Sequence, residues 1–358
     1  MNNSFYDILT KKVTNNEALS QEDAVRVLDL GQLETLELLQ VAYQFRRQYF
    51  GKMVTVHILN NVQNGMCPED CRYCAQSASS SAPIEPYGMK SDEEILAEAA
   101  EAHDSGAMRY CMVFSGTGPS YERVDHLVRL IKQIKQRHKI EVCVSAGAVD
   151  RNQARQLKEA GLDRLNHNLN TSEKYYHHIC TSHTYADRLQ TLQAAHAEGL
   201  AVCSGVIIGM GENAQDLYEM TYNLRELGAE SIPVNFLIPI PGIALKEARG
   251  LSPEYCLRVL CLFRLMNPKA EIRMAAGREI HLGSLEPLGL FAANSLFLQG
   301  YLNTRGAADV RTLTMIKDAG FTISSEIPMD KLLSRSSGPM LPEGLKSLDE
   351  LRPFKVRE

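Results

Sequence analysis

The sequence predicts an α/β protein built on a (β/α)₈ TIM-type barrel, with an N-terminal helical extension and an irregular C-terminal tail. Three observations lead to this fold. Short strand-like runs alternate with longer helical segments, eight strand candidates can be counted, and 358 residues suffice for a barrel of about 250 residues plus extensions. An open doubly wound sheet is the alternative, because strands are easily miscounted in a single sequence.

The strand candidates are short, rich in branched or aromatic residues, and bounded by Gly, Asn or charged stretches. They cover residues 54–62, 108–114, 140–147, 164–169, 201–209, 231–238, 271–276 and 295–300. The segments between them place apolar residues at helical spacing, over 92–106, 124–138, 153–161, 186–199, 214–228, 253–266 and 283–294. Strands that alternate with helices lie parallel, so these units are expected to close into a barrel over residues 51–325.

The two ends of the chain differ from this alternating pattern. Residues 1–50 form an expected N-terminal extension of amphipathic helices, over 18–30 and 33–50, that packs on the barrel. Residues 326–358 contain helix breakers and little apolar material, so they are expected to form an irregular tail.

Composition excludes several classes of protein. Hydrophobic residues make up 44% and charged residues 23% of the chain, which excludes a disordered or fibrous protein. A net charge of −5 argues against a nucleic-acid partner. No apolar run reaches the roughly 18 residues that cross a membrane, and the first 20 residues lack the apolar core of a signal peptide. Nine cysteines without an export signal favour a cytoplasmic location, where thiols stay reduced.

Three cysteines, Cys67, Cys71 and Cys74 in CPEDCRYC, directly follow the first predicted strand. A loop at the carboxyl end of a barrel strand is where such folds place their chemistry. Thiolates select zinc or iron–sulfur clusters, and a four-iron cluster usually takes four cysteines. Three closely spaced thiols would therefore leave one iron open to a substrate or cofactor. A structural zinc site with a distant fourth ligand, or three unligated thiols, is the alternative.

Three further cysteines and one arginine lie inside separate predicted strands: Cys111, Cys143, Cys203 and Arg273. Parallel barrel strands can direct such residues into one lumen, although each cysteine alone also fits a buried core position. A charged residue within an apolar strand is either paired with a carboxylate or bound to a ligand. The three cysteines therefore form a second candidate constellation, and Arg273, taken on the residues alone, is interpreted as a member of an ion pair.

The remaining cysteines and histidines carry no predicted role. Cys256 and Cys261 lie in an apolar helix, which favours core packing. Cys180 stands in HHICTSH with three histidines, a segment interpreted as a solvated helix start. Arg278 is interpreted as structural.

The motif Cys-x₃-Cys-x₂-Cys, with Tyr73 before its last cysteine, resembles that of the radical S-adenosylmethionine superfamily. Over residues 20–325 the chain is similar to the biotin synthase family within it, through CPEDCRYCAQS, LNHNLNTS, VCSGVIIGMGE, IPVNF and IRMAAGRE in the same order. The resemblance implies that Cys67, Cys71 and Cys74 hold a 4Fe–4S cluster whose open iron binds S-adenosylmethionine. It also implies a 2Fe–2S cluster on Cys111, Cys143, Cys203 and Arg273.

Amide side chains end the fourth predicted strand at Asn166, Asn168 and Asn170. Clustered amides can bond ribose hydroxyls or a ureido group, although Asn also suits loops and helix starts. The resemblance implies that Asn168 and Asn170 contact the ribose of S-adenosylmethionine. It places the ureido group of dethiobiotin at Asn166 or Asn168.

The resemblance assigns further contacts to other motifs. Gly205, Ile207 and Glu212 of G-x-I-x-G-x-x-E would lie beside the adenine, and Tyr73 would lie on the cofactor side. Asn235 in IPVNF would bind the ureido ring of the substrate. Taken alone, Gly-x-Ile-x-Gly also fits ordinary close packing.

The function implied by the resemblance is radical insertion of sulfur into dethiobiotin, the last step of biotin biosynthesis. Unactivated C–H bonds offer no acidity to a general base, so a radical from S-adenosylmethionine is required, with sulfur from the 2Fe–2S cluster. The implied partners are dethiobiotin, a flavodoxin- or ferredoxin-type electron donor, and a second copy of the chain in a homodimer. Another radical S-adenosylmethionine enzyme with only the first cluster, or an electron-transfer or sensor protein, is the alternative.

Overall fold

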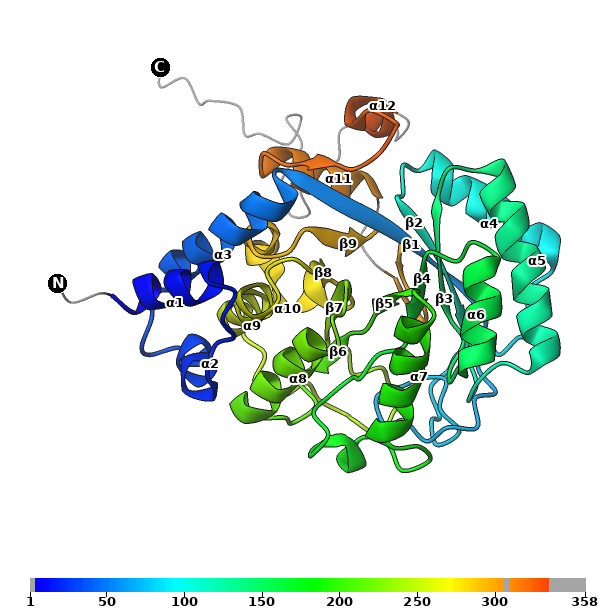
Figure 1. Cartoon of the computed structure of the whole chain (residues 1–358), viewed down its shortest axis with the longest axis horizontal. Coiled ribbons are helices and arrows are strands. Elements are labelled where there is room, and N and C mark those ends of the chain that lie inside the picture. The colour runs from blue at the N-terminus through cyan, green and yellow to red at the C-terminus, as the bar shows by residue number, and fades with distance from the viewer. Residues whose placement is uncertain (1–3, 306–308, 335–358) are drawn as a thin grey trace, which may run out of the picture.

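The computed structural model describes residues 4–305 and 309–334. Its centre is a ring of parallel strands surrounded by helices (Figure 1). The barrel strands are β1 Met53–Gln63, β2 Arg109–Phe114, β3 Glu141–Ser145, β4 Arg164–Asn166, β5 Ala201–Cys203 with β6 Val206–Ile208, β7 Ser231–Phe236, β8 Glu271–Met274 and β9 Ser295–Phe297. They pair in chain order, and β9 returns to pair with β1, which closes the ring. The predicted barrel is confirmed, and the open sheet is excluded.

The predicted strand 201–209 is divided into β5 and β6, and the neighbouring strand explains why. Cys203 pairs with Ser231 and Val206 with Val234, so Pro233 stands opposite the gap between β5 and β6. Proline has no N–H to donate, so the ladder is interrupted there. Gly205 fills the gap without a side chain, since a Cβ at this position would lie 2.3 Å from the Pro233 carbonyl oxygen.

Helices fill the gaps between the strands as predicted, and local caps start several of them. The crossover helices are α4 Asp92–Asp104, α5 Tyr121–Arg137, α6 Arg151–Glu159, α7 Tyr185–Ala197, α8 Ala214–Glu226 and α9 Pro253–Met266. The last gap holds α10 Arg278–His281 and a 3₁₀ segment, η2 Gly283–Phe291, which contains Pro287. Ser91 and Thr184 begin α4 and α7 with capping boxes, in which the acidic residue three positions later returns a hydrogen bond.

Three helices precede the barrel: α1 Phe5–Thr14, α2 Gln21–Leu28 and α3 Thr35–Phe50. The last two match the predicted helices, and α1 is an addition that begins with a capping box at Ser4. Both α2 and α3 pack on α9, which explains why α9 is almost wholly buried, its two arginines Arg258 and Arg264 included. Cys256 and Cys261 of α9 are fully buried, which confirms their predicted core packing.

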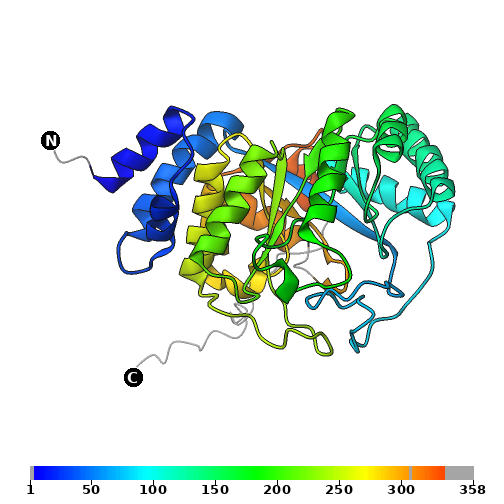
Figure 2. The same ribbon diagram turned by 60° about the horizontal axis from the view of Figure 1, so that its bottom comes forward.

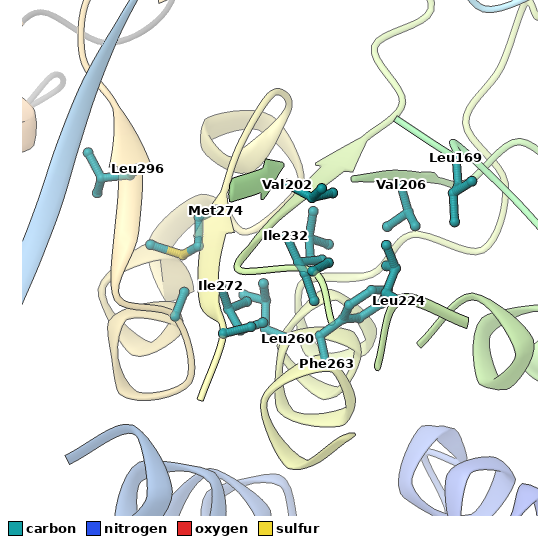
Figure 3. Packing of buried hydrophobic residues seen from close by; sticks show 14 of the residues in the cluster. Leu169, Val202, Val206, Leu224, Ile232, Leu260, Phe263, Ile272, Met274 and Leu296 are labelled. Carbon is teal, nitrogen blue, oxygen red and sulfur yellow. The ribbon is translucent and has the colours of Figure 1, made fainter. Parts of the chain in front are cut away.

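The main hydrophobic core lies between the barrel strands and the helices outside them. Figure 3 shows Ile232 and Ile272 from β7 and β8 together with Leu224 of α8 and with Leu260 and Phe263 of α9. Each of these side chains is fully buried. Burial of a large aliphatic or aromatic side chain contributes about 1.5–3 kcal/mol, so this layer holds the strand ends in position.

The chain after β9 adds small elements to the barrel. They are β10 Gly300–Tyr301, β11 Thr304–Arg305, α11 Asp309–Asp318, β12 Thr322–Ile323 and α12 Met329–Ser334. The predicted irregular tail therefore begins with one short helix, and residues 335–358 lie outside the described residues. The division of the chain at residues 50 and 325 into separate units stays a prediction. Within the described part, none of the helices is long and apolar enough to span a membrane.

Loops gather at the carboxyl end of the barrel. In Figure 2 the blue-to-cyan segment 64–91, between β1 and α4, lies at the lower end beside the yellow-green segment 237–252. The N–H of Ser81 donates to the carbonyl of Gly242 at 3.0 Å, which joins the two segments. The predicted cysteine loop therefore lies at the end of the barrel that holds the chemistry in such folds.

Candidate active site

One cavity of about 990 Å³ lies at the carboxyl ends of the strands. Its size is at the upper end of the range for small-molecule sites. Most of the predicted site residues line it: Cys67, Cys71, Tyr73, Cys74, Cys111, Cys143, Asn166, Asn168, Asn170, Cys203, Ile207, Asn235 and Arg273. The barrel thus brings together side chains from strands β2 to β8 and from the cysteine loop.

The cysteine loop is fixed by two acidic side chains within it. Asp70 Oδ1 accepts the backbone N–H groups of Thr181 at 2.9 Å and Ser182 at 3.0 Å. Glu69 accepts hydrogen bonds from the hydroxyls of Thr117 and Ser182. Because these partners follow other strands, the loop is tied across the mouth of the cavity with its three thiols at the lining.

Two thiols of the loop, those of Cys71 and Cys74, favour the protonated state when no metal is bound. Burial raises the pKa of Cys74. A hydrogen bond to Cys180, followed by burial, raises the pKa of Cys71. Metal ligation requires thiolates, so binding of a cluster here would release protons and would be favoured by higher pH.

The second constellation lies deeper in the same cavity. Cys111 and Cys143 are register partners on β2 and β3, and the neighbouring thiols of Cys111 and Cys203 raise the pKa of Cys143. The Nη1 atom of Arg273 lies 3.8 Å from Cys203 Sγ. The four side chains therefore converge, as the barrel prediction required, and three soft donors face one point of the lumen.

Arg273 is anchored along one edge of its guanidinium group. Its Nε donates to Ser295 Oγ at 2.9 Å, and its Nη2 donates to Ser231 Oγ at 2.9 Å and to the Glu271 carboxylate. The Nη2 edge also lies 3.2 Å from His57 Nε2. These bonds leave Nη1 directed toward the thiol of Cys203.

Glu271 is the centre of the charged layer beneath the thiols. Its carboxylate lies 3.3 Å from Arg109 Nη1, 3.4 Å from Arg164 Nη1 and 2.9 Å from His57 Nε2. Burial alone would raise the pKa of Glu271, but Arg273, His57 and Arg109 hold it well below its ordinary value. The carboxylate therefore stays ionised and compensates the buried arginines.

The predicted amides form a network around the cavity. Asn168 Oδ1 accepts from the Gly205 N–H at 2.9 Å and from Asn166 Nδ2 at 3.1 Å. Asn170 has a left-handed backbone (φ +70°) and donates to the Tyr73 hydroxyl at 2.7 Å. Each amide has further hydrogen-bonding capacity, so the network presents oriented donors and acceptors to a ligand.

Asn235 is held in the same way on β7. Its Nδ2 donates to the Val206 carbonyl at 2.9 Å, and its Oδ1 accepts from the Ala276 N–H at 3.2 Å. Ile207 adds an apolar contact to the lining. The two residues belong to neighbouring strands, which places a polar and an apolar group side by side.

Gly205 and Glu212 are absent from the described lining of the cavity. Glu212 accepts the N–H groups of Gly209 at 2.6 Å, Met210 at 2.9 Å and Gly211 at 3.0 Å, so its carboxylate organises the turn after β6. Gly205 has no side chain, which allows β5 and β6 to lie close to β7. Their contact with a cofactor stays a prediction.

Replacing Gly205 with alanine is expected to lower the free energy of unfolding by about 1–3 kcal/mol, because the new Cβ would overlap a neighbouring strand. Urea unfolding of both proteins measures the effect. Gly88→Ala is the matched control, since a Cβ added at Gly88 would have no heavy atom within 4 Å and the residue has no left-handed φ. Equal unfolding midpoints for the two variants would contradict the close-packing account.

Three residues near the site were not predicted from the sequence: Arg188, Cys180 and His183. Arg188 lines the cavity and donates to the Asn168 carbonyl at 2.9 Å. Its position was detectable, because Arg188 shares one face of α7 with the buried Leu192 and Ala195. His183 is largely buried and hydrogen-bonds Cys180. The interpretation of this segment as solvated therefore holds for two of its three histidines, His177 and His178, which are exposed.

Comparison with known proteins agrees with this geometry. The model of the radical SAM superfamily matches residues 63–221, and that of the biotin and thiamin synthesis associated domain matches residues 233–322. A biotin synthase from Magnetococcus marinus is 55% identical over 302 residues, 84% of this chain and 94% of the relative. One from Acaryochloris marina is 50% identical over 90% of this chain and 93% of the relative.

Solved structures show the same fold at low identity. Methylornithine synthase superposes with a TM-score of 0.77 at 20% identity, over 88% of this chain and 97% of that structure. The FeFe-hydrogenase maturase HydG from Carboxydothermus hydrogenoformans gives 0.76 at 17% identity, over 92% and 81%. At this identity the likeness concerns the fold alone.

Proposed function

This chain belongs to the biotin synthase family of radical S-adenosylmethionine enzymes, and we propose that its cavity converts dethiobiotin to biotin with two iron–sulfur clusters. One observation carries the proposal. The cysteine loop and a separate set of three thiols with Arg273 line the same cavity, one at its mouth and one in its depth.

The residues of the cavity fit the two groups. Cys67, Cys71 and Cys74 supply three thiols at one loop, the number that leaves an iron open, and would hold a 4Fe–4S cluster. Cys111, Cys143, Cys203 and Arg273 would hold a 2Fe–2S cluster, because their donor atoms converge. When bound, the first cluster would supply the electron that cleaves S-adenosylmethionine, and the second would supply sulfur.

The chain's own groups would bind and orient the two organic molecules. Asn168 and Asn170, with Tyr73 and Ile207, would contact S-adenosylmethionine beside the loop. Asn166 and Asn235 would bond the ureido group of dethiobiotin, since both are fixed by neighbouring backbone or side-chain bonds.

The enclosure of the site suits radical chemistry. The lining is mostly apolar or firmly hydrogen-bonded, and side chains from opposite strands surround a bound molecule. Exclusion of water limits side reactions of a reactive intermediate, and fixed amides hold the substrate between cofactor and sulfur source. The protein would therefore contribute position and shielding, while the bound groups contribute the radical.

Cys143→Ala tests this assignment. We expect the anaerobically reconstituted, reduced variant to form 5′-deoxyadenosine from S-adenosylmethionine but no biotin from dethiobiotin, because only the deeper cluster loses a ligand. Both products are quantified by chromatography, and iron content and absorbance report the clusters. Cys261→Ala, in the core of α9, is the matched control and is expected to form both.

Two results would contradict the proposal. Biotin formation by Cys143→Ala at the wild-type level would remove the deeper thiols from the reaction. Deoxyadenosine without biotin from the wild-type protein itself would point to a different radical S-adenosylmethionine enzyme.

Partners, location and domain organisation complete the proposal. The family resemblance supports a flavodoxin- or ferredoxin-type electron donor and a homodimer. Nine unpaired cysteines support a cytoplasmic location, because thiols stay reduced there. Residues 1–50 would act as a helical extension and residues 51–325 as the catalytic barrel.

A further inference from the structure

A fourth cysteine lies directly behind the cysteine loop and has no part in the proposed reaction. Cys180 follows the 3₁₀ segment η1 Tyr176–His178 and is buried. Its Sγ lies 3.8 Å from Cys71 Sγ and 2.6 Å from His183 Nδ1. Cys180 therefore lies beside a proposed ligand of the 4Fe–4S cluster without being one itself.

The three side chains resemble a metal site, but their hydrogen bonds indicate another role. The donor atoms of Cys71, Cys180 and His183 lie within 4.8 Å of one another. Arg188 Nη2 lies 2.7 Å from His183 Nε2, and a guanidinium only donates, so Nε2 is the acceptor. The ring proton then belongs on Nδ1 and is directed to Cys180 Sγ. Neither ring nitrogen of His183 therefore has a free lone pair for a metal ion.

These hydrogen bonds fix the sulfurs of Cys71 and Cys180 beside each other. Asp70 binds the N–H groups of Thr181 and Ser182, so the segment that carries Cys180 is tied to the residue next to Cys71. A disulfide needs an S–S distance of about 2.05 Å, so the two sulfurs would have to approach each other from their present 3.8 Å. A reactive cysteine beside a second, resolving cysteine is the arrangement that forms reversible disulfides.

We propose that Cys71 and Cys180 form a disulfide when the cluster-free chain meets hydrogen peroxide, and that this bond preserves Cys71 for later cluster assembly. The proposal rests on the proposed function, because Cys71 needs preservation only as a cluster ligand. In the bound state Cys71 would be occupied by iron, so the disulfide belongs to the cluster-free chain alone.

The chemistry balances with peroxide as the oxidant. The sulfur of Cys71, which lines the cavity, attacks one peroxide oxygen, the O–O bond breaks, and a sulfenic acid on Cys71 and one water form. The Cys180 thiol then displaces the hydroxyl of the sulfenic acid as a second water, and the S–S bond forms. Two thiols are oxidised and one peroxide is reduced. Without a resolving thiol, further peroxide would carry a sulfenic acid on Cys71 to the irreversible sulfinic acid.

The test uses the full-length, metal-free chain and no measurement of biotin. The chain is treated with hydrogen peroxide, and free thiols are then alkylated and peptides mapped by mass spectrometry. We expect a single linked pair, Cys71 with Cys180. In Cys180→Ala we expect sulfinic acid on Cys71, and Cys261→Ala is the control that should behave as wild type. Cys180→Ser replaces Cys180→Ala if the alanine variant does not fold.

A second readout follows the consequence for cluster assembly. After peroxide and then dithiothreitol, the wild-type chain should regain its full 4Fe–4S absorbance on reconstitution, whereas Cys180→Ala should regain less than half. Linkage of Cys71 to Cys67 or Cys74 instead, or equal recovery in the two proteins, would overturn the proposal. Both readouts are independent of sulfur insertion, so they separate this proposal from the proposed function.

Discussion

Replacement of Cys74 by alanine is expected to abolish formation of both 5′-deoxyadenosine and biotin. Cys74 is one of three thiols on the loop that lines the mouth of the cavity, and the loop holds no fourth cysteine. Loss of a group that merely orients a metal ligand lowers affinity or activity by about 10–100-fold, so loss of a ligand should exceed that range. Loss of Cys74 should stop both products, whereas loss of a deeper cysteine should stop biotin alone, because both products depend on the first cluster.

The measurement compares anaerobically reconstituted wild type, Cys74→Ala and the core control Cys256→Ala. Iron content, cluster absorbance and both products are recorded in each protein. Deoxyadenosine from Cys74→Ala at a tenth of the wild-type rate or more would show that Cys74 is not required as a ligand. Because burial raises the pKa of Cys74, cluster assembly in the wild type should also weaken as the pH is lowered.

Replacement of Glu271 by glutamine is expected to lower the free energy of unfolding by about 3–5 kcal/mol, the range for breaking a buried ion pair. The carboxylate is the shared partner of Arg109 and Arg273, which are buried, and of Arg164, which is partly exposed. A neutral amide would leave these guanidinium groups buried with too little negative charge. Arg273 would also lose one of the bonds that direct its Nη1 toward Cys203.

Urea unfolding of the metal-free proteins near pH 7 measures this change. Glu141→Gln is the control, because Glu141 pairs with only one cation among the described residues, Arg109, and is about a third exposed. A loss for Glu271→Gln no greater than that for Glu141→Gln would contradict the central role of Glu271.

The pH dependence of stability supplies an independent check with a defined sign. The pKa of Glu271 in the folded protein lies below its ordinary value of 4.5. Its stabilising contribution is therefore complete above that ordinary value and is lost as the pH falls toward the lowered folded value. Below pH 4.5 the wild type should lose stability more steeply than Glu271→Gln.

Local signals in the sequence determined most of the architecture. Helical spacing, capping residues such as Ser91 and Thr184, and short apolar runs act over a few residues, so they located the strands and crossover helices of the barrel. The same locality made the Cys67–Cys74 loop recognisable as a candidate ligand set after the first strand. The grouping of Cys111, Cys143 and Cys203 followed from the geometry of a barrel, whereas Arg273 was added to them by the resemblance.

Other features depend on neighbours that are distant in the chain. The break between β5 and β6 follows from Pro233 on the adjacent strand, which no local pattern in 201–209 reveals. The meeting of Glu271 with arginines of β2, β4 and β8 requires the register of a closed ring. The placement of Cys180 behind Cys71 requires the contacts of Asp70 with the segment after β4.

The sequence by itself determined the class of fold, the order of its elements and the cysteine loop, because hydrophobic period, caps and motif spacing are properties of short segments. Only the tertiary structure decided which polar groups face one another: Arg273 Nη1 with Cys203, Glu271 with its arginines, and Cys180 with Cys71 and His183. The physical reason is that barrel closure and strand register bring these atoms together, and both arise from pairing between strands far apart in the chain.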